Sequence, residues 1–182
     1  MDNVKQQVTK LLRTDGLEEI ICVILSENDT HVLLSEFSNS LDFDGLILVP
    51  LSSIVHVTSE FNDVEFYEKL LRMPSLELQL RASTQLMAEG LTPKLEMLAD
   101  RHAIVSVECE LVDPGFASVG WIDSIIAGQL NLAPLSARGI KYETLDVFKI
   151  EDVTKIEFDT RYIRALAFAN EALDKTKLPI KF

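Results

Sequence analysis

The sequence predicts an α+β fold in which short antiparallel strands form two duplicated small barrels, each flanked by short helices. The main observation is an internal repeat about 98 residues apart: residues 32–37 resemble 130–135, and residues 51–57 resemble 150–156 after one extra residue. Each half then closes with a tyrosine that is followed four residues later by a leucine. A repeated apolar pattern requires similar burial in each copy. We therefore expect two similarly folded modules that meet through a two-fold-like contact.

The first half is predicted to begin and end with a helix. Apolar residues recur at helical spacing over residues 3–13, and a second amphipathic pattern covers 61–71. Between them, β-branched or alternating apolar runs are separated by polar turns, which is typical of strands. These predicted strands are residues 19–25, 31–37, 46–50 and 54–57.

The second half follows a connector at residues 75–101. Thr92-Pro93 is a good helix start, with Thr as N-cap and Pro at the first helical position, so a helix is predicted over 93–101. A closing helix is predicted over 161–173. The predicted strands between these helices are 103–111, 116–126, 129–135, 144–149 and 153–158.

Short connections between these strands require antiparallel pairing, since a parallel pair needs a crossover of a dozen or more residues. Five short antiparallel strands can curl into a barrel that hides the edges of the sheet. The predicted organisation is a first barrel module at residues 1–74, a helical connector at 75–101, and a second barrel module with a C-terminal helix at 102–182.

The charge of the chain favours a protein partner over a nucleic acid. The formal net charge is −12, and residues 1–91 carry 15 acidic against 6 basic side chains. Nucleic-acid binders ordinarily carry a basic surface instead. Such an acidic first half is compatible with a basic protein partner.

The apolar runs and the two cysteines of the chain indicate its cellular location. No run is long enough to cross a membrane, and the first residues lack the apolar stretch of a signal peptide. Cys22 and Cys109 lie at non-matching positions of the two halves, in strand-like runs where a buried thiol is expected. We therefore expect a cytoplasmic protein with reduced cysteines and no membrane association.

Gly120-Trp121-Ile122, with Asn131-Leu132 eleven residues after the glycine, resembles the first motif of the Sm-like proteins. The order of elements is also similar to that of SH3-like small barrels. The apolar-Arg-Gly segment of the second Sm motif has no counterpart in residues 148–152, so the resemblance implies the fold and not RNA binding. The chain also resembles bacterial proteins of undefined role, through residues 150–156 and the helix that begins at Tyr162.

The sequence predicts no catalytic residues, no metal site and no cofactor. His31, His56 and His102 are scattered and lack zinc-ligand spacing. The segment 42–45 resembles the start of a calcium loop without its later ligands, so a polar turn explains it better. A thiol enzyme built on Cys22 or Cys109 is a weaker hypothesis, because nucleophilic catalysis also needs an adjacent base.

Two groups of residues are candidate binding sites. Asp63, Glu65 and Glu68 form an acidic face on the predicted helix 61–71, and Asp42 and Asp44 add to the acidic surface of the first half. Such a patch is either a solvated face or a docking surface for a basic partner.

Trp121 and Asn131 form the other group, as a candidate ligand platform. Burial is the simpler interpretation of the single tryptophan, because small domains use their largest aromatic residue in packing.

The favoured hypothesis is therefore a non-enzymatic cytoplasmic binding protein that docks a basic protein partner, and a homodimer is also compatible with the sequence. One alternative is a divergent Sm-like RNA-binding protein, a hypothesis based on Gly120 and Asn131. Another is an immunity-type protein that neutralises a basic toxin through charge-steered association.

Overall fold

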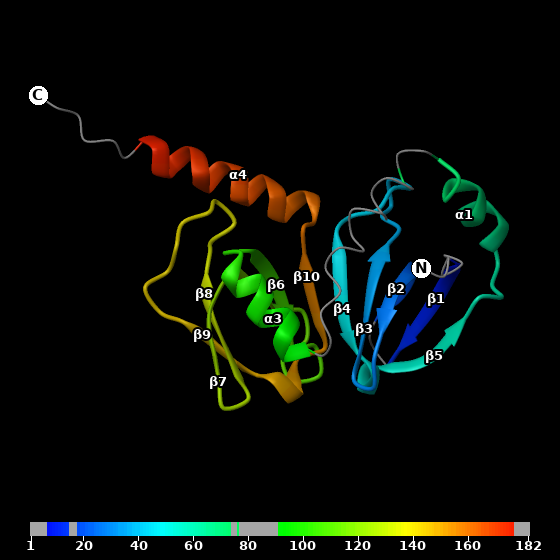
Figure 1. Ribbon diagram of the computed structural model, residues 1–182, viewed down its shortest axis with the longest axis horizontal. Helices are drawn as coiled ribbons and strands as arrows, with labels where there is room; N and C mark the ends of the chain where they lie inside the picture. The colour runs from blue at the N-terminus through cyan, green and yellow to red at the C-terminus, as the bar shows by residue number, and fades with distance from the viewer. Residues whose placement is uncertain (1–6, 15–17, 74–75, 77–90, 177–182) are drawn as a thin grey trace, which may run out of the picture.

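The computed structural model describes residues 7–14, 18–73, 76 and 91–176, with side chains up to residue 170. Ten strands form one antiparallel sheet in the order β5-β1-β2-β3-β4-β10-β6-β7-β8-β9 (Figure 1). The strands of the first half are β1 (Val8–Arg13), β2 (Glu19–Glu27), β3 (His31–Glu36), β4 (Leu46–Pro50) and β5 (Ile54–Thr58). Those of the second half are β6 (Ile104–Glu108), β7 (Ala117–Ile126), β8 (Gln129–Pro134), β9 (Asp146–Lys149) and β10 (Lys155–Phe158).

The two halves repeat the same strand order. The first half reads β5-β1-β2-β3-β4, and the second reads β10-β6-β7-β8-β9. An irregularity in the ladder lies between Ile24 and Ser26 in β2 and between Ile122 and Ser124 in β7, 98 residues later. A short 3-10 helix precedes the last strand of each half: η1 (Leu51–Ser53) and η3 (Ile150–Asp152).

The expectation of two separate small barrels is wrong. β4 of the first half pairs with β10 of the second, so both halves belong to one open sheet whose end strands are β5 and β9. β4 and β10 thus satisfy each other's backbone hydrogen bonds, and neither half closes on itself. The structure therefore does not support the likeness to tandem Sm-like or SH3-like barrels.

The contact between the halves is also not two-fold. A two-fold contact would join equivalent strands, whereas here the fourth strand of one half meets the last strand of the other. The halves are therefore joined head to tail.

The predicted helix at residues 3–13 is wrong where the structure describes it. Residues 8–13 form β1, which lies between β5 and β2 and pairs with both. Val8 and Leu11 are fully buried on opposite faces of this strand. Spacings of three and four residues fit a helical face, but burial on both sides of a sheet also fits them. Residues 1–6 lie outside the described residues.

In the described part of the chain, three helices border the sheet: α1 (Val64–Leu70), α3 (Leu91–Asp100) and α4 (Arg161–Thr176). Each lies where the sequence predicts a helix, with ends that shift by at most three residues. Most of the predicted connector, residues 77–90, lies outside the described part of the chain. α3 packs against β7, and its Leu91, Leu95 and Leu98 enter the main core. α4 crosses the second half near β6 (Figure 1), where Ile163 and Leu166 pack on Ile104.

The main core extends across both halves on one face of the sheet. It includes Leu48 and Ile156, which pair across the junction of β4 and β10 and are each 1% exposed. A second buried cluster belongs to the first half alone and lies on the reverse face. Its members are Leu11, Ile20, Cys22, Leu34, Ile47 and Val49.

Polar contacts reinforce the junction between the halves. The Arg13 guanidinium donates to both carboxylate oxygens of Glu110, at 3.2 and 2.5 Å, and to the carbonyl oxygen of Thr154 at 3.0 Å. The ammonium of Lys155 lies 2.8 Å from the Glu18 carboxylate and 3.0 Å from that of Glu108. β1 and Glu18, the residue before β2, are thereby linked to the segment after β6 and to the start of β10.

Among the described residues, no helix has both the length and the apolar character needed to cross a membrane.

Candidate binding site

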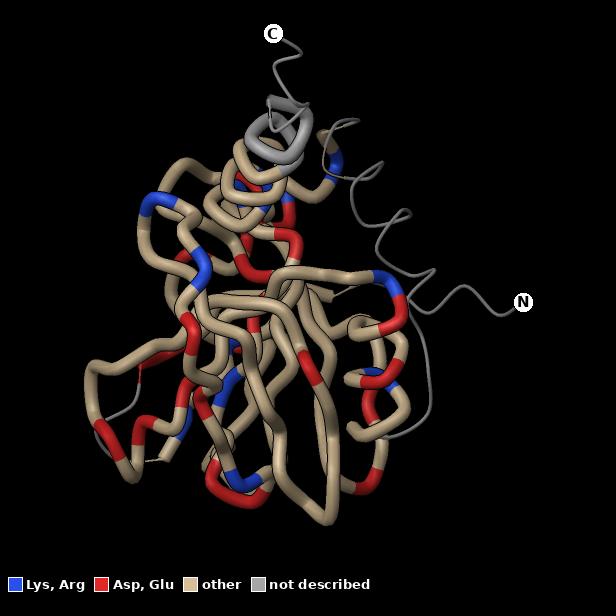
Figure 2. Tube along the Cα trace, turned by 90° about the vertical axis from the view of Figure 1, so that its left-hand side faces the viewer, with Lys and Arg blue, Asp and Glu red and all other residues tan. Residues whose placement is uncertain are grey.

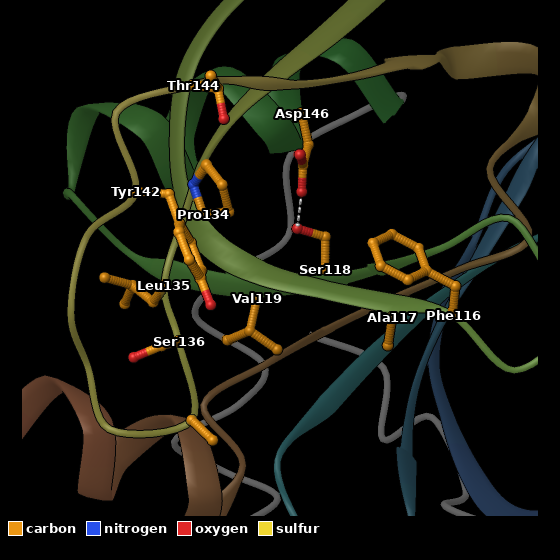
Figure 3. A pocket seen from close by; sticks show the side chains of 11 residues that line it. Phe116, Ala117, Ser118, Val119, Pro134, Leu135, Ser136, Tyr142, Thr144 and Asp146 are labelled. Carbon is orange, nitrogen blue, oxygen red and sulfur yellow. Dashed lines mark hydrogen bonds between the residues drawn. The ribbon is translucent and has the colours of Figure 1, made fainter.

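A hollow of about 420 Å³ opens on the second half, between β7, the end of β8, the loop 135–145 and the start of β9 (Figure 3). We call it the β7–β9 cup. Its lining residues are Phe116, Ala117, Ser118, Val119, Pro134, Leu135, Ser136, Ala137, Tyr142, Thr144 and Asp146.

The base of the cup holds a hydrogen-bonded polar pair. The Ser118 hydroxyl donates to Oδ2 of Asp146 across 2.5 Å, as the dashed line in Figure 3 marks. Ser118 is only 4% exposed, whereas Asp146 is partly exposed. A carboxylate has several acceptor positions, so Asp146 can accept a further donor while it holds Ser118.

The same places in the first half are apolar. Ser118 corresponds to Ile20 of the first half, because Ser118 pairs with Val107 as Ile20 pairs with Leu11. Asp146 corresponds to Ile47, because Asp146 pairs with Leu132 as Ile47 pairs with Leu34. Ile20 and Ile47 are at most 1% exposed and belong to the buried cluster of the first half. The second half therefore has a polar, partly open cup where the first half has packed core.

Gly120 allows β7 and β8 to approach closely beside the cup. A Cβ atom at this position would lie 2.2 Å from the carbonyl oxygen of Ala133, which is too short for any real contact. The equivalent residue of β2 is Cys22, so the close approach distinguishes the second half from the first.

Two exposed aromatic rings flank the polar pair. Figure 3 shows Phe116 on one side of Ser118 and Asp146, and Tyr142 on the other. Phe116 is 46% exposed and Tyr142 is 53% exposed. The backbone N–H of Tyr142 donates to the carbonyl oxygen of Pro134 at 3.0 Å, which ties the loop to the end of β8.

The electrostatic character of the cup is acidic. Asp146 is the single charged residue among the described residues that line it. Over the described trace, Asp and Glu positions outnumber Lys and Arg positions, as the red and blue segments of Figure 2 show. A cationic group would therefore meet the Asp146 carboxylate in the cup as the one charge of its lining.

The two cysteines remain thiols at neutral pH. Burial, with the nearby Glu36 carboxylate, raises the pKa of Cys22 far above its ordinary value. Burial, with Asp152 and Asp113, raises the pKa of Cys109 to about 11. Since the thiolate is the nucleophilic form, both environments disfavour thiol chemistry.

Part of the sequence-predicted acidic patch borders a second hollow, of about 470 Å³, beside α1. Asp63 and Glu65 line it, together with Phe61, Val64, Phe66 and Lys69. Glu68 is exposed on the same helix but does not line the hollow. Asp63 precedes the helix in a left-handed conformation, with φ of 68°.

Asp42 and Asp44 are instead occupied within the protein. Arg161 forms ion pairs with both carboxylates. Its backbone N–H, at the start of α4, also donates to Oδ1 of Asp44 at 2.7 Å. These two aspartates thus hold α4 of the second half against the loop between β3 and β4.

Trp121 and Asn131 lie in β7 and β8 but do not line the cup. Trp121 is partly buried against Ile163 and Leu166 of α4, in the third apolar cluster. Asn131 donates from Nδ2 to the Ser124 hydroxyl at 3.0 Å, across the irregularity in the β7–β8 ladder. Both contacts are structural in kind.

Within the described ranges, no group of three or more His, Cys, Asp or Glu side chains is arranged to hold a metal ion. Comparison of the chain with protein-family models, with curated proteins and with solved structures returned no match.

The sequence reasoning did not identify Ser118 and Asp146. The internal repeat pointed to these two residues, because Ser118 and Asp146 are polar where the aligned residues of the first half are Ile20 and Ile47. A polar residue that replaces a buried isoleucine in one copy of a duplicated pattern marks a place where that copy has changed its packing.

Proposed function

We propose that this protein is a non-enzymatic binding protein that docks a basic protein partner, with an arginine or lysine side chain of the partner seated in the β7–β9 cup. The observation that carries the proposal is the polar pair Ser118–Asp146 between two exposed aromatic rings, at a place where the first half is solid core. The cup thus offers a carboxylate, two ring faces and room for one side chain.

The chemistry of the lining selects a cation. Asp146 can form an ion pair with a guanidinium or ammonium group, and it is oriented by the hydrogen bond from Ser118. A cation against an aromatic face gains about 0.5–1 kcal/mol at an exposed site. Phe116 and Tyr142 offer such faces at the rim, and their exposure leaves them accessible to a partner.

The acidic charge of the molecule supports the same partner chemistry. A net charge of −12 accelerates encounter with a basic protein and repels a phosphate backbone. The hollow beside α1, with Asp63 and Glu65, is a second acidic surface that the same partner can contact.

The test is a titration of the uniformly ¹⁵N-labelled protein with two short blocked peptides, Ac-Gly-Arg-Gly-NH₂ and Ac-Gly-Glu-Gly-NH₂. We expect the arginine peptide to shift the amide signals of Ser118, Val119 and Thr144, and the glutamate peptide to leave them unchanged. Asp146→Asn should abolish the response. Glu143→Gln is the matched control, because it removes one negative charge from the same loop outside the cup.

A response that Asp146→Asn and Glu143→Gln weaken equally would mean that general charge, and not the cup, attracts the peptide. Equal shifts with both peptides, or no shifts at these amides with either, would reject the proposal.

A further inference from the structure

The junction between the halves is a strand pairing that the fold can repeat. β4 and β10 pair antiparallel, with Leu48 opposite Ile156 and Ile47 opposite Glu157. Because the pairing joins two non-equivalent strands, it is heterologous. Each half uses one of its two outer strands in the junction, and its second outer strand, β5 or β9, lies at an end of the sheet.

The end strands of the sheet are the counterparts of the two strands at the junction. β5 pairs with β1 as β10 pairs with β6, so Val57, opposite Leu11, corresponds to Ile156, opposite Val107. β9 pairs with β8 as β4 pairs with β3, so Val147, opposite Asn131, corresponds to Leu48, opposite Leu33. One end of the sheet thus carries a β10-like strand, and the other end a β4-like strand.

These counterparts are exposed where the junction residues are buried. Val57 is 46% exposed and Val147 is 56% exposed, whereas Ile156 and Leu48 are each 1% exposed. β5 also presents Val55 at 67% exposure. A sheet edge with exposed apolar residues favours pairing with another strand.

We propose that a second copy of this chain docks on this protein head to tail, with β9 of one copy paired antiparallel to β5 of the next in the register of the internal junction. Val147 of one copy then lies opposite Val57 of the next, as Leu48 lies opposite Ile156 within the chain. Asp146 of one copy lies opposite Thr58 of the next, as Ile47 lies opposite Glu157 at the internal junction.

The occupant is a second copy because the chain already contains this contact once. Both partner strands of the pairing are present on every molecule, and the internal junction gives their register. A heterologous contact leaves a free strand at each end of the assembly, so it continues until the copies close into a ring or extend as a filament. The inference does not depend on the proposed function of the β7–β9 cup.

The test is the molar mass of four proteins measured by light scattering after size exclusion, up to about 0.1 mM, where a contact of micromolar Kd is nearly saturated. The wild-type protein should exceed the 20.4 kDa of a single chain. Val57→Lys and Val147→Lys should each lower the mass substantially, because a lysine on an edge strand blocks pairing. Val112→Lys, at a position 65% exposed in the turn after β6, is the matched control and should retain the wild-type mass.

The mixing experiment separates this arrangement from a two-fold dimer. Each lysine variant keeps one intact edge, so an equimolar mixture of Val57→Lys and Val147→Lys should form a dimer of twice the single-chain mass, with one copy of each. In a two-fold dimer through β5 alone, Val147→Lys would stay dimeric and the mixture would not gain mass.

A single-chain mass for the wild-type protein at the highest concentration would overturn the proposal, and this result needs no substitution. A mixture that remains monomeric would overturn it as well. The double variant Val57→Lys/Val147→Glu offers a second check, because opposite charges now face one another across the contact and should restore assembly.

Discussion

Replacement of Arg13 by methionine tests the polar contact that links the two halves. The Arg13 side chain is fully buried, and the Glu110 side chain is 15% exposed. Removal of one partner of a buried ion pair costs about 3–5 kcal/mol. Because some solvent reaches Glu110, and Thr154 still donates to it at 2.8 Å, we expect the lower end, a loss of about 3 kcal/mol in the free energy of unfolding.

The assay is urea unfolding followed by circular dichroism. With a slope of about 2 kcal/mol per molar urea, the midpoint should fall by about 1.5 M. Lys10→Met is the matched control, since it removes a partly solvent-exposed ion pair with Glu19 and should cost less than about 1 kcal/mol. The double variant Arg13→Met/Glu110→Met should be more stable than Arg13→Met, because it leaves no unpaired buried charge.

The contact also predicts a pH dependence. Burial alone would raise the pKa of Glu110, but hydrogen bonds from Arg13 and Thr154 and the charge of Arg13 outweigh it and hold the pKa below its ordinary value of 4.5. The stability due to the pair is therefore complete above pH 4.5 and is lost as the pH falls through the lowered pKa. The difference between wild type and Arg13→Met should shrink in this range. If Arg13→Met lowered the free energy of unfolding by no more than Lys10→Met does, the assigned role of the Arg13–Glu110 contact would be refuted.

Three further results are expected from single substitutions and labelling. Gly120→Ala should lower the free energy of unfolding by about 1–3 kcal/mol in urea titrations, because its Cβ would collide with the backbone of β8, and a neutral substitution would contradict that contact. Burial and the nearby Glu18 raise the pKa of Glu36 from 4.5 to about 7, so its ionisation opposes folding increasingly between these pH values. Thermal unfolding should therefore show Glu36→Gln to be more stable than wild type by about 1–2 kcal/mol above pH 7 and equal to it below pH 4.5, and a constant difference would exclude this cause. Cys22 and Cys109 should react with a maleimide slowly in the folded protein and rapidly in urea, since both pKa values are raised, and rapid reaction of the folded protein would contradict their burial.

The individual strands could be predicted largely from local pattern. Residues 46–50 and 129–134 are strands almost as predicted, because their apolar residues lie between polar turns. β1 could not be recognised in this way. Its apolar spacing fits a helical face, and only its position between β5 and β2 decides that both faces are buried.

The pairing of β4 with β10 could not be predicted from local sequence patterns. The partners Leu48 and Ile156 lie far apart in the sequence, and either strand could equally have paired within its own half. The internal repeat indicated similar halves, but a repeat does not specify whether its copies meet as equivalent or as non-equivalent strands.

The residues that line the β7–β9 cup were not among the binding residues predicted from the sequence, which lie elsewhere in the structure. Asp63 and Glu65 do border a hollow, whereas Asp42 and Asp44 are paired with Arg161, a residue more than one hundred positions away. The β7–β9 cup becomes visible when the two halves are compared position by position. The repeat aligns Ser118 with Ile20 and Asp146 with Ile47, but only the structure shows that the isoleucines are buried and that the two polar residues meet.

The central claim is that one continuous sheet runs through both halves by way of β4 and β10. The most direct measurement is a nuclear Overhauser spectrum that looks for cross-strand contacts between the backbone protons of Ile47 and Glu157 and of Leu48 and Ile156. The structure predicts contacts for both pairs, in antiparallel register. Their absence, together with contacts that join β4 to β5 within the first half, would show closed separate modules and contradict the account.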